Sequence, residues 1–477
     1  MLYIERIIYV YIYIYTPYKM DKDEELLSSP TVTIVEEGES YINDDEGVPT
    51  TTSIAQQECE ESCLAYLYED TQEKDAEENG NSSSDATTSN PLLLRDSHVK
   101  YCKRGLEKLG RGFTALDASK PWLMYWMIHS ISLLNGEITE KMKDRVVDTL
   151  EKYQNNDTGG FGGGFFQLSH CAPTYSGILT LMSIGTKKAY DVINRKKMYQ
   201  FFLARKASSG GFSMHDDGEN DVRATYTVLA VASILNILTP ELVKGTAEWV
   251  AQCQTYEGGF GGEPFNEAHG GYTFCGLASL CILKQTNLIN MKRLLRWITR
   301  RQMLKEGGYQ GRTHKLVDAC YSFWQGSTPA MLYLATNGKY STPTVDNNNN
   351  NNNNDVINNI WNQGDLICDQ LALQKYILLC CQQHDGGLRD KPSKFRDFYH
   401  TCYALSGLSI AQNGVGNVSN TSPIVYKNKL DHVDQIQPTH PIYNVRQDKL
   451  LKAMEYFLEI SGGTTPSHDV LVNDELE

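Results

Sequence analysis

Two kinds of apolar pattern alternate along most of the chain. Residues 174–184, 223–235 and 398–410 are apolar nearly all round and rich in small side chains. Residues 241–253 and 291–303 instead combine one apolar face with one polar face. A helix that is apolar all round is buried, and an amphipathic helix lies between a core and water. The pattern therefore predicts pairs made of one inner helix and one outer helix.

A paired glycine followed by a bulky residue marks the turn between successive helix pairs. The second glycines recur about every 50 residues, at Gly160, Gly211, Gly259, Gly308 and Gly387. The last interval is longer because it contains the asparagine run 347–354. Stacked pairs of this kind build an open solenoid or a closed ring. Because the inner set is so apolar, we predict an all-α fold, an α/α toroid of about six helical hairpins.

The repeats also predict the domain organisation. We expect the toroid to occupy residues 91–462, interrupted by an asparagine-rich insertion at about 341–363 and a loop at 412–439. Residues 1–90 are expected to form a disordered acidic extension, because so polar a segment cannot bury enough apolar surface to fold alone. Residues 463–477 are expected to be a disordered tail.

Charge and cysteine content narrow the function classes. The formal net charge of −14 comes from residues 21–90, which hold 20 acidic residues and 2 lysines, so the body is nearly neutral. No basic run suggests nucleic acid as a partner. No apolar run reaches the ~18–20 residues of a membrane helix, so stable membrane insertion is not expected. The 12 irregularly spaced cysteines favour a reducing, cytoplasmic compartment over a disulfide framework.

Candidate chemistry gathers at one end of the predicted ring. Equivalent positions of stacked repeats face one way, so polar residues at the starts of inner helices should converge on the mouth of a central cavity. Asp318 and Cys320 begin one such helix and His400 begins the next. Carboxylate, thiolate and imidazole are zinc ligands, and three protein ligands leave an open position typical of catalytic zinc. Each residue alone is more often an ordinary core residue, so the hypothesis depends on their shared register.

A second candidate set could be cationic. Arg312 and Lys315 precede Asp318, and His269 lies at the matching position of the preceding repeat. Three such groups above an aromatic cavity suggest a diphosphate head with an apolar tail, assisted by helix N-termini. The alternative is an ordinary solvated surface. The acidic stretch 215–221 lacks the spacing of a magnesium motif for prenyl diphosphates and is interpreted as a polar turn.

At this point the motifs identify a family resemblance. GRTHKLVDACYSFWQG at 311–326 and RDFYHTCYALSGLS at 396–409 resemble the β subunits of protein prenyltransferases, those of farnesyltransferases in particular. The likeness spans about 92–411 and 440–458 and includes PWLMYW, GGFGGG, HCAPTY, DVRATY and HGGYTFCGLASL. It implies an α/α toroid that works as an obligate heterodimer with an α subunit. It also implies zinc-dependent transfer of farnesyl from farnesyl diphosphate to the cysteine of C-terminal CaaX sequences, as in small GTPases.

The resemblance also assigns roles to residues of this chain. It implies that the Zn²⁺ ligands are Asp318, Cys320 and His400, with the substrate thiol at the open position. Contacts to the diphosphate would come from His269, Arg312, Lys315 and Tyr321. The isoprenoid pocket would be lined by Arg223, Tyr272, Cys275, Trp324, Trp122 and Tyr175. Positions near the peptide substrate would be Trp126, Tyr399 and His170. Mg²⁺ assisting the diphosphate would involve Asp390.

Several alternatives remain open from the sequence. The nearest is the β subunit of geranylgeranyltransferase type I. Trp122 argues against it because a bulky indole shortens the pocket, and Asp390 argues against it because the geranylgeranyl relatives tend to carry Lys there. Triterpene cyclases share glycine-rich toroid repeats but need an acid such as a D-x-D-D motif, which is absent from the sequence. In a non-catalytic binding toroid, the occurrence together of Asp318, Cys320, His400, Arg312 and Lys315 would be accidental.

Overall fold

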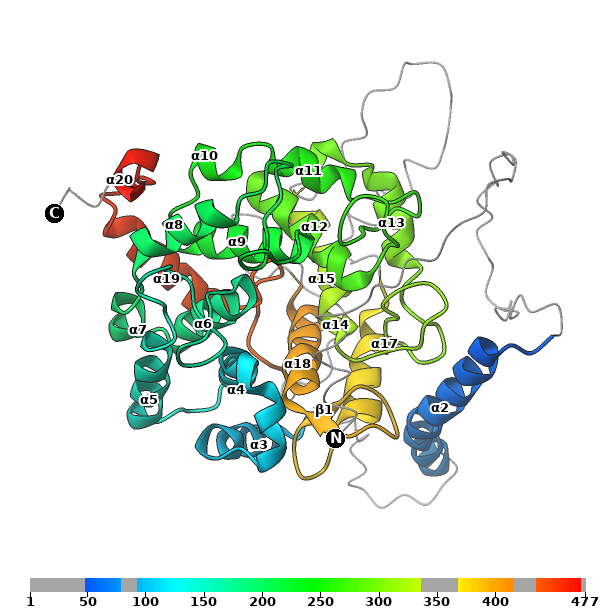
Figure 1. The fold of residues 1–477 in the computed structure, drawn as a ribbon. Coiled ribbons are helices and arrows are strands. Elements are labelled where there is room, and N and C mark those ends of the chain that lie inside the picture. Colours follow the sequence, from blue (N-terminus) through cyan, green and yellow to red (C-terminus); the bar gives the residue numbers. More distant parts are fainter. Residues whose placement is uncertain (1–47, 79–91, 336–367, 415–434, 473–477) are drawn as a thin grey trace, which may run out of the picture.

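Six inner helical segments form a closed ring. The computed structural model describes residues 48–78, 92–335, 368–414 and 435–472. Each inner segment packs against the next, and the last packs back against the first (Figure 1). In chain order they are α4 (Lys120–Leu133), α6 (Cys171–Ile184), α9 (Val222–Ile234), α12 (Gly270–Leu283), α14 (Tyr321–Trp324) with α15 (Ser327–Ala335), and α18 (Phe398–Asn413). The predicted α/α toroid is confirmed.

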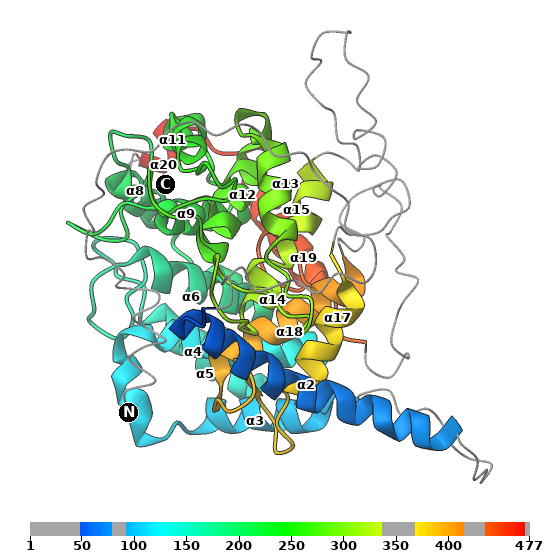
Figure 2. The ribbon, with the colours of Figure 1, turned by 90° about the vertical axis from the view of Figure 1, so that its right-hand side faces the viewer.

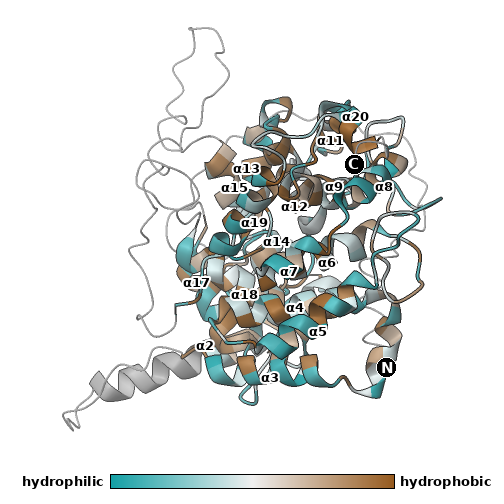
Figure 3. Ribbon diagram, turned by 90° about the vertical axis from the view of Figure 1, so that its left-hand side faces the viewer, coloured by the Kyte–Doolittle hydropathy of each residue, from teal (hydrophilic) through white to brown (hydrophobic). Residues whose placement is uncertain are grey.

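The outer helices surround this ring and are amphipathic. In α13 (Met291–Thr299) the buried residues are Leu294, Leu295, Trp297 and Ile298, and the charged residues point outward. Figure 3 shows the same division, with teal on the outer α5 and brown along the inner α12. The remaining outer helices are α3 (Arg95–Glu107), α5 (Glu140–Glu151), α8 (Arg195–Arg205), α11 (Thr246–Gln252) and α17 (Gln370–Lys375), which continues as the π-helix η3 (Tyr376–Cys381).

Short elements connect the two layers. Strands β1 (Leu388–Arg389) and β2 (Arg396–Asp397) form a small antiparallel hairpin, with Leu388 opposite Asp397. The other short elements are η1 (Arg111–Ser119), α7 (Lys187–Asp191), α10 (Pro240–Val243) and η2 (Thr286–Leu288).

The paired glycines let each turn touch the outer helix of its repeat. Gly258 has φ +109°, and a Cβ there would lie 2.1 Å from the backbone oxygen of Arg293. Only glycine fits such a conformation and such an approach. The second glycine of each pair packs against an aromatic ring of an outer helix. These contacts are Gly160 with Phe201, Gly211 with Trp249, Gly259 with Trp297, Gly308 with Tyr376, and Gly387 with Tyr101.

The C-terminal segment crosses the interior of the ring near the C-terminal ends of the inner helices. The Gln437 amide donates to Leu133 O at 2.8 Å, and Ser409 Oγ donates to Gln437 O at 2.7 Å. Tyr125 donates to Asn444 O at 2.7 Å. The chain then continues into α19 (Gln447–Glu459), which packs on α6 and α9. This segment closes one end of the ring, which leaves the N-terminal ends of the inner helices as the mouth.

One helix, α2 (Thr51–Glu78), lies within residues 1–90, for which we expected disorder. It lies along the outer wall and packs on η3 (Figure 2). Cys59 and Cys63, four residues apart on one helix face, are buried there. The average composition of the segment hides this short apolar stripe. Residues 1–47 and 79–91 lie outside the described residues.

The C-terminal tail shows a similar difference. Within the expected disordered tail, α20 (His468–Val472) packs on α8, and its Leu471 is buried. Residues 473–477, the predicted insertion at 341–363 and most of the predicted loop 412–439 lie outside the described residues.

A further difference concerns the inner helix expected over 318–335. Residues 318–320 precede the helix, and Gln325 and Gly326 separate α14 from α15. The Asp318 side chain accepts from the Cys320 amide at 2.8 Å, which fixes a turn in place of a helical start. The two candidate ligands therefore lie on a turn at the mouth.

Close packing of α18 on α14 gives a first prediction. A Cβ at Gly407 would lie 2.3 Å from Ser322 Cβ and 2.5 Å from its backbone carbon. Gly407→Ala should therefore destabilise the protein by ~1–3 kcal/mol through overpacking, measured as thermal unfolding of the assembled enzyme. Gly112→Ala is the control, because no heavy atom lies within 4 Å of its Cβ position. Equal unfolding temperatures for both variants would contradict this packing.

Candidate functional site at the mouth of the ring

Polar residues gather at the mouth because the inner helices begin there. The side chain of His170 accepts from the Ala172 amide at 3.0 Å and so caps α6. His269 caps α12 in the same way, through the Gly271 amide at 3.1 Å. Asp221 caps α9 and Asp397 caps α18. The unpaired amides at a helix start favour a side-chain acceptor, and these four inner helices each place such a polar group at their N-terminal end. Of these four residues, His170 and His269 are predicted site residues, and the structure places both at the starts of inner helices, as expected.

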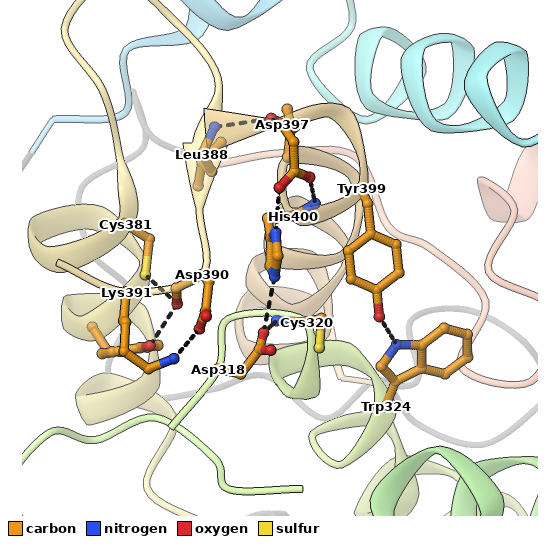
Figure 4. A network of polar contacts seen from close by, with 12 residues as sticks. Asp318, Cys320, Trp324, Cys381, Leu388, Asp390, Lys391, Asp397, Tyr399 and His400 are labelled. Atoms are coloured by element: carbon orange, nitrogen blue, oxygen red, sulfur yellow. Dashed lines mark hydrogen bonds and ion pairs between the residues drawn. The ribbon is translucent and has the colours of Figure 1, made fainter. Parts of the chain in front are cut away.

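Asp318, Cys320 and His400 come together as one candidate metal centre. Their ligand atoms all lie within 4.8 Å of one another. Among the residues that the structure describes, no other set of three such groups lies close enough to hold a metal ion. Asp318 Oδ1 lies 3.2 Å from His400 Nε2. Figure 4 shows the three side chains directed toward one another, two from the turn before α14 and one from α18.

His400 is oriented by Asp397. Its Nδ1 lies 2.6 Å from Asp397 Oδ2, and its backbone amide donates to Asp397 Oδ1 at 2.7 Å. A carboxylate can only accept, so Nδ1 carries a proton and Nε2 faces Asp318 and Cys320. Nε2 is buried and has no hydrogen-bond donor or acceptor beyond the Asp318 ion pair. An imidazole held in this way by a carboxylate is the usual arrangement of a metal-binding histidine.

The electrostatics of the triad favour charged groups. Burial alone would raise the pKa of the Asp318 carboxyl, but the neighbouring His400 holds that pKa well below its usual range. Burial alone would lower the pKa of His400, but Asp397 and Asp318 raise it well above its usual range. Burial raises the pKa of the Cys320 thiol, and the charge of Asp318 adds to that effect. The thiol would therefore ionise only beside a strong positive charge.

Asp390 supports the turn that carries two of these residues. Its backbone oxygen accepts from the Ala319 amide at 2.9 Å. Its carboxylate pairs with Lys391 Nζ at 2.5 Å, with both side chains only 12% exposed (Figure 4). Burial raises the pKa of Asp390, and the charge of Asp318 raises it further. The segment after β1 thus contributes both a structural carbonyl and a buried ion pair beside the triad.

The predicted diphosphate set is partly assembled. Tyr321 Oη lies 3.0 Å from His269 Nε2. Burial lowers the pKa of His269 to about 4, helped by Arg312 and Arg223, so this imidazole is neutral at pH 7 and is not the cation we expected. Arg312 Nη1 pairs with the half-exposed Glu267 at 2.5 Å. Lys315 lies three residues after Arg312 in the sequence and is exposed.

Arg223 is held against the wall of the interior. Its Nε and Nη2 donate to Asp221 Oδ2 at 2.9 and 2.5 Å. The guanidinium carbon lies 5.8 Å from the ring centre of Tyr272. Both side chains are partly buried, and the ion pair fixes the Arg223 position at the start of α9.

Aromatic rings connect the mouth to the interior. The ring centre of Trp122 lies 5.8 Å from those of Trp126 and Tyr175. Trp324 Nε1 donates to Tyr399 Oη at 3.2 Å, and the Tyr399 and Trp126 rings lie 5.5 Å apart. These predicted lining residues therefore form one continuous aromatic cluster. Cys275 is buried on the adjacent α12.

Several residues at this site had no predicted role. Phe274 and Tyr403 pack on Trp324 with ring centres 4.9 and 4.4 Å away. Asp397 could have been found from its spacing, because a carboxylate three residues before a histidine at a helix start can both cap the helix and hold the imidazole. Lys391 carried no such signal, because its carboxylate partner is its own chain neighbour.

Comparison with known proteins agrees with this fold. The family model described as prenyltransferase alpha-alpha toroid domain matches residues 93–445. Among solved structures, Candida albicans protein geranylgeranyltransferase-I complexed with GGPP is similar with a TM-score of 0.58 at 20% identity, covering 77% of this chain and 99% of that one. The fold and the match define a toroid of the prenyltransferase type.

Sequence relatives narrow the family. The protein farnesyltransferase subunit beta of Arabidopsis thaliana is 40% identical over 79% of this chain and 86% of its own length. That of Pisum sativum is 42% identical over 72% and 90%. The geranylgeranyl transferase type-1 subunit beta of Arabidopsis thaliana is only 26% identical over 67% and 85%. The chain belongs to the family of protein farnesyltransferase β subunits, which are prenyltransferase enzymes. Within the described residues no helix has the length and apolarity to cross a membrane.

The contact between Asp397 and His400 gives a second prediction. Asp397→Asn keeps an N-cap acceptor but loses the carboxylate that fixes the imidazole. We expect metal affinity of the triad to fall ~10–100-fold, measured by competition with a chromophoric zinc chelator. Asp369→Asn is the matched control, since Asp369 caps α17 through the Ala372 amide without touching the triad. Unchanged affinity in Asp397→Asn would show that the carboxylate does not orient a metal ligand.

Proposed function

We propose that this chain is the catalytic β subunit of a protein farnesyltransferase. It transfers farnesyl from farnesyl diphosphate to the cysteine thiol of C-terminal CaaX sequences, with Zn²⁺ and an α subunit as obligate partner, in the cytoplasm. The single observation that carries the proposal is the Asp318–Cys320–His400 triad beside a continuous cluster of aromatic rings. The names of the sequence relatives support the same activity.

The three residues fit a zinc ion. Their donors are a carboxylate oxygen, a thiolate and a histidine nitrogen, and the buried Nε2 of His400 contacts no polar group other than the Asp318 carboxylate 3.2 Å away. This set leaves a fourth position for a substrate thiol. When bound, Zn²⁺ supplies the positive charge that lowers the pKa of a coordinated thiol, so that it reacts as a thiolate. Asp397 holds the imidazole, and the Asp390 carbonyl holds the turn of the other two ligands.

The residues at the mouth would bind the leaving group. The substrate sulfur forms a bond to the first carbon of the prenyl chain while the carbon–oxygen bond breaks and its electron pair leaves with the diphosphate. Tyr321, Arg312 and Lys315 would donate hydrogen bonds to the charge that develops there. The neutral His269 would orient the Tyr321 hydroxyl. Arg312 can exchange its exposed Glu267 for the diphosphate at small cost, because such surface pairs contribute only ~0–1 kcal/mol.

Asp390 is proposed to assist through Mg²⁺. Its carboxylate already faces the Lys391 ammonium at 2.5 Å. A magnesium ion at this carboxylate would have to compete with that buried ammonium. Lys391 therefore provides the neutralising charge whenever the cation is absent.

The aromatic cluster would receive the two organic substrates. Trp122, Tyr175, Trp324, Tyr272, Cys275 and Arg223 are proposed to line the isoprenoid pocket. Trp126, Tyr399 and His170 are proposed to lie near the CaaX peptide of clients such as small GTPases. The alternative donor, geranylgeranyl diphosphate, needs a longer pocket, and the Trp122 indole packed between Trp126 and Tyr175 opposes it.

Loss of the thiol ligand gives a third prediction. Cys320→Ala, co-expressed with a candidate α subunit, should lose bound zinc and CaaX-peptide farnesylation together, because two ligands hold the ion poorly. Zinc content and transfer are measured on the same purified complex. Cys253→Ala is the control, because it removes a buried thiol from the outer layer. Full activity of Cys320→Ala without zinc would refute the metal assignment.

The size of Trp122 gives a fourth prediction. Trp122→Thr removes the indole and should shift preference from farnesyl toward geranylgeranyl diphosphate by ~10-fold or more in kcat/KM, since the discrimination is steric. Both donors are assayed side by side with one CaaX peptide. A variant that keeps the farnesyl preference would place the length limit elsewhere in the pocket.

A further inference from the structure

Tyr376 occupies a packing position that recurs in every repeat. Its ring lies against Gly308, as the aromatic rings of four other outer helices lie against their own turns. The equivalent residues are Phe201, Trp249, Trp297 and Tyr101. The repeated role needs only a ring. A hydroxyl is therefore an additional feature, present in two of the five positions.

The Tyr376 hydroxyl reaches the support of the metal triad. It is fully buried and donates to Asp390 O at 2.8 Å. The same oxygen accepts from the Ala319 amide at 2.9 Å and from Cys381 Sγ at 3.8 Å. Ala319 lies between the ligands Asp318 and Cys320. One carbonyl thus joins the η3 helix to the turn that carries two ligands.

The same carbonyl is tied to the third ligand through the hairpin. Asp390 directly follows β1, and β1 pairs with β2 so that Leu388 lies opposite Asp397. Asp397 in turn holds the imidazole of His400. A shift of Asp390 would therefore change the separation between the Asp318–Cys320 turn and His400. Figure 4 shows the contacts of Cys381 with Asp390, of Leu388 with Asp397, and of Asp397 with His400.

We infer that Tyr376 is a positioning residue for the metal triad, whose hydroxyl sets the spacing between the ligands of two repeats. The inference rests on the proposed function, because it takes the triad as a zinc site. The helix geometry supports it, since Tyr376 begins the π-helical turn η3. Such turns interrupt regular helices at functional sites. The α2 helix packs on the same turn from outside and buries Cys63 beside Cys380.

The test compares two tyrosines at the same repeat position. Tyr376→Phe keeps the ring and removes the donor, whereas Tyr101→Phe removes a hydroxyl with no hydrogen bond among the described residues. Each variant is purified as the complex with an α subunit. Zinc affinity is measured by chelator competition, and unfolding of the metal-free complex is measured separately. We expect ~10-fold weaker zinc binding for Tyr376→Phe, at the lower end of effects from outer partners of metal ligands, and wild-type affinity for Tyr101→Phe.

Two further readouts separate positioning from simple stabilisation. In the cobalt-substituted Tyr376→Phe complex, the sulfur-to-metal charge-transfer band should shift. At saturating zinc, kcat should fall while KM for farnesyl diphosphate stays unchanged. A stable Tyr376→Phe complex with wild-type zinc affinity overturns the inference. If Tyr376→Phe does not fold, Cys381→Ala tests the weaker donor to the same carbonyl, and wild-type zinc affinity there also overturns it.

The outcome also distinguishes the inference from the function on which it rests. A wild-type complex that binds no zinc would refute the zinc site itself. A wild-type complex that binds zinc, beside a Tyr376→Phe complex that binds it equally well, would refute only the role of Tyr376.

Discussion

The close approach of each glycine turn to an outer helix is the constraint on which the rest of the structure depends. At Gly258 a single added carbon would overlap the backbone oxygen of Arg293. Contact at this distance holds each glycine turn against the first turn of an outer helix, as Gly258 lies against Arg293 near the start of α13. Repeated around the ring, it points every inner helix start toward the same mouth. The site exists there because the turns are alike.

Helix capping then gives that mouth its polar character. The side chains of His170, Asp221, His269 and Asp397 accept hydrogen bonds from the first amides of α6, α9, α12 and α18, which are four of the six inner segments. The structural requirement and the chemical one are met by the same side chains. Asp397 is the clearest case, because it holds both the first turn of α18 and the ring of His400. Burial lowers the pKa of His269, so its imidazole is neutral. A neutral imidazole keeps one nitrogen unprotonated, and that nitrogen is the acceptor that caps α12.

Much of this arrangement could be predicted from the sequence. Because the repeat is periodic, polar residues at equivalent positions of the repeats are expected at the same end of the ring. The repeat register suggests that Asp318, Cys320 and His400 lie together, the family resemblance assigns them as a ligand set, and the structure brings them together. The docking of α2 was missed because only a few of its residues, such as Cys59 and Cys63, contact the ring. The non-helical turn at 318–320 was missed because local apolarity suggests a helix while the Asp318 side chain competes for the backbone. Asp390 holds the turn through its backbone oxygen. Every residue type has such an oxygen, so the sequence gives no signal of this contact.

The segment that crosses the ring interior has a consequence for how the molecule is made. The first inner helix, α4, is completed only by partners near the end of the chain, since Gln437 and Asn444 bond to it and α18 packs on its flank. Contacts so distant in sequence form slowly, and during synthesis the early helices must wait with their apolar faces uncovered. A ribosome that stops short of Asn444 leaves an open arc with exposed aromatic rings. Closure of the ring therefore has to wait until the last part of the chain has been synthesised.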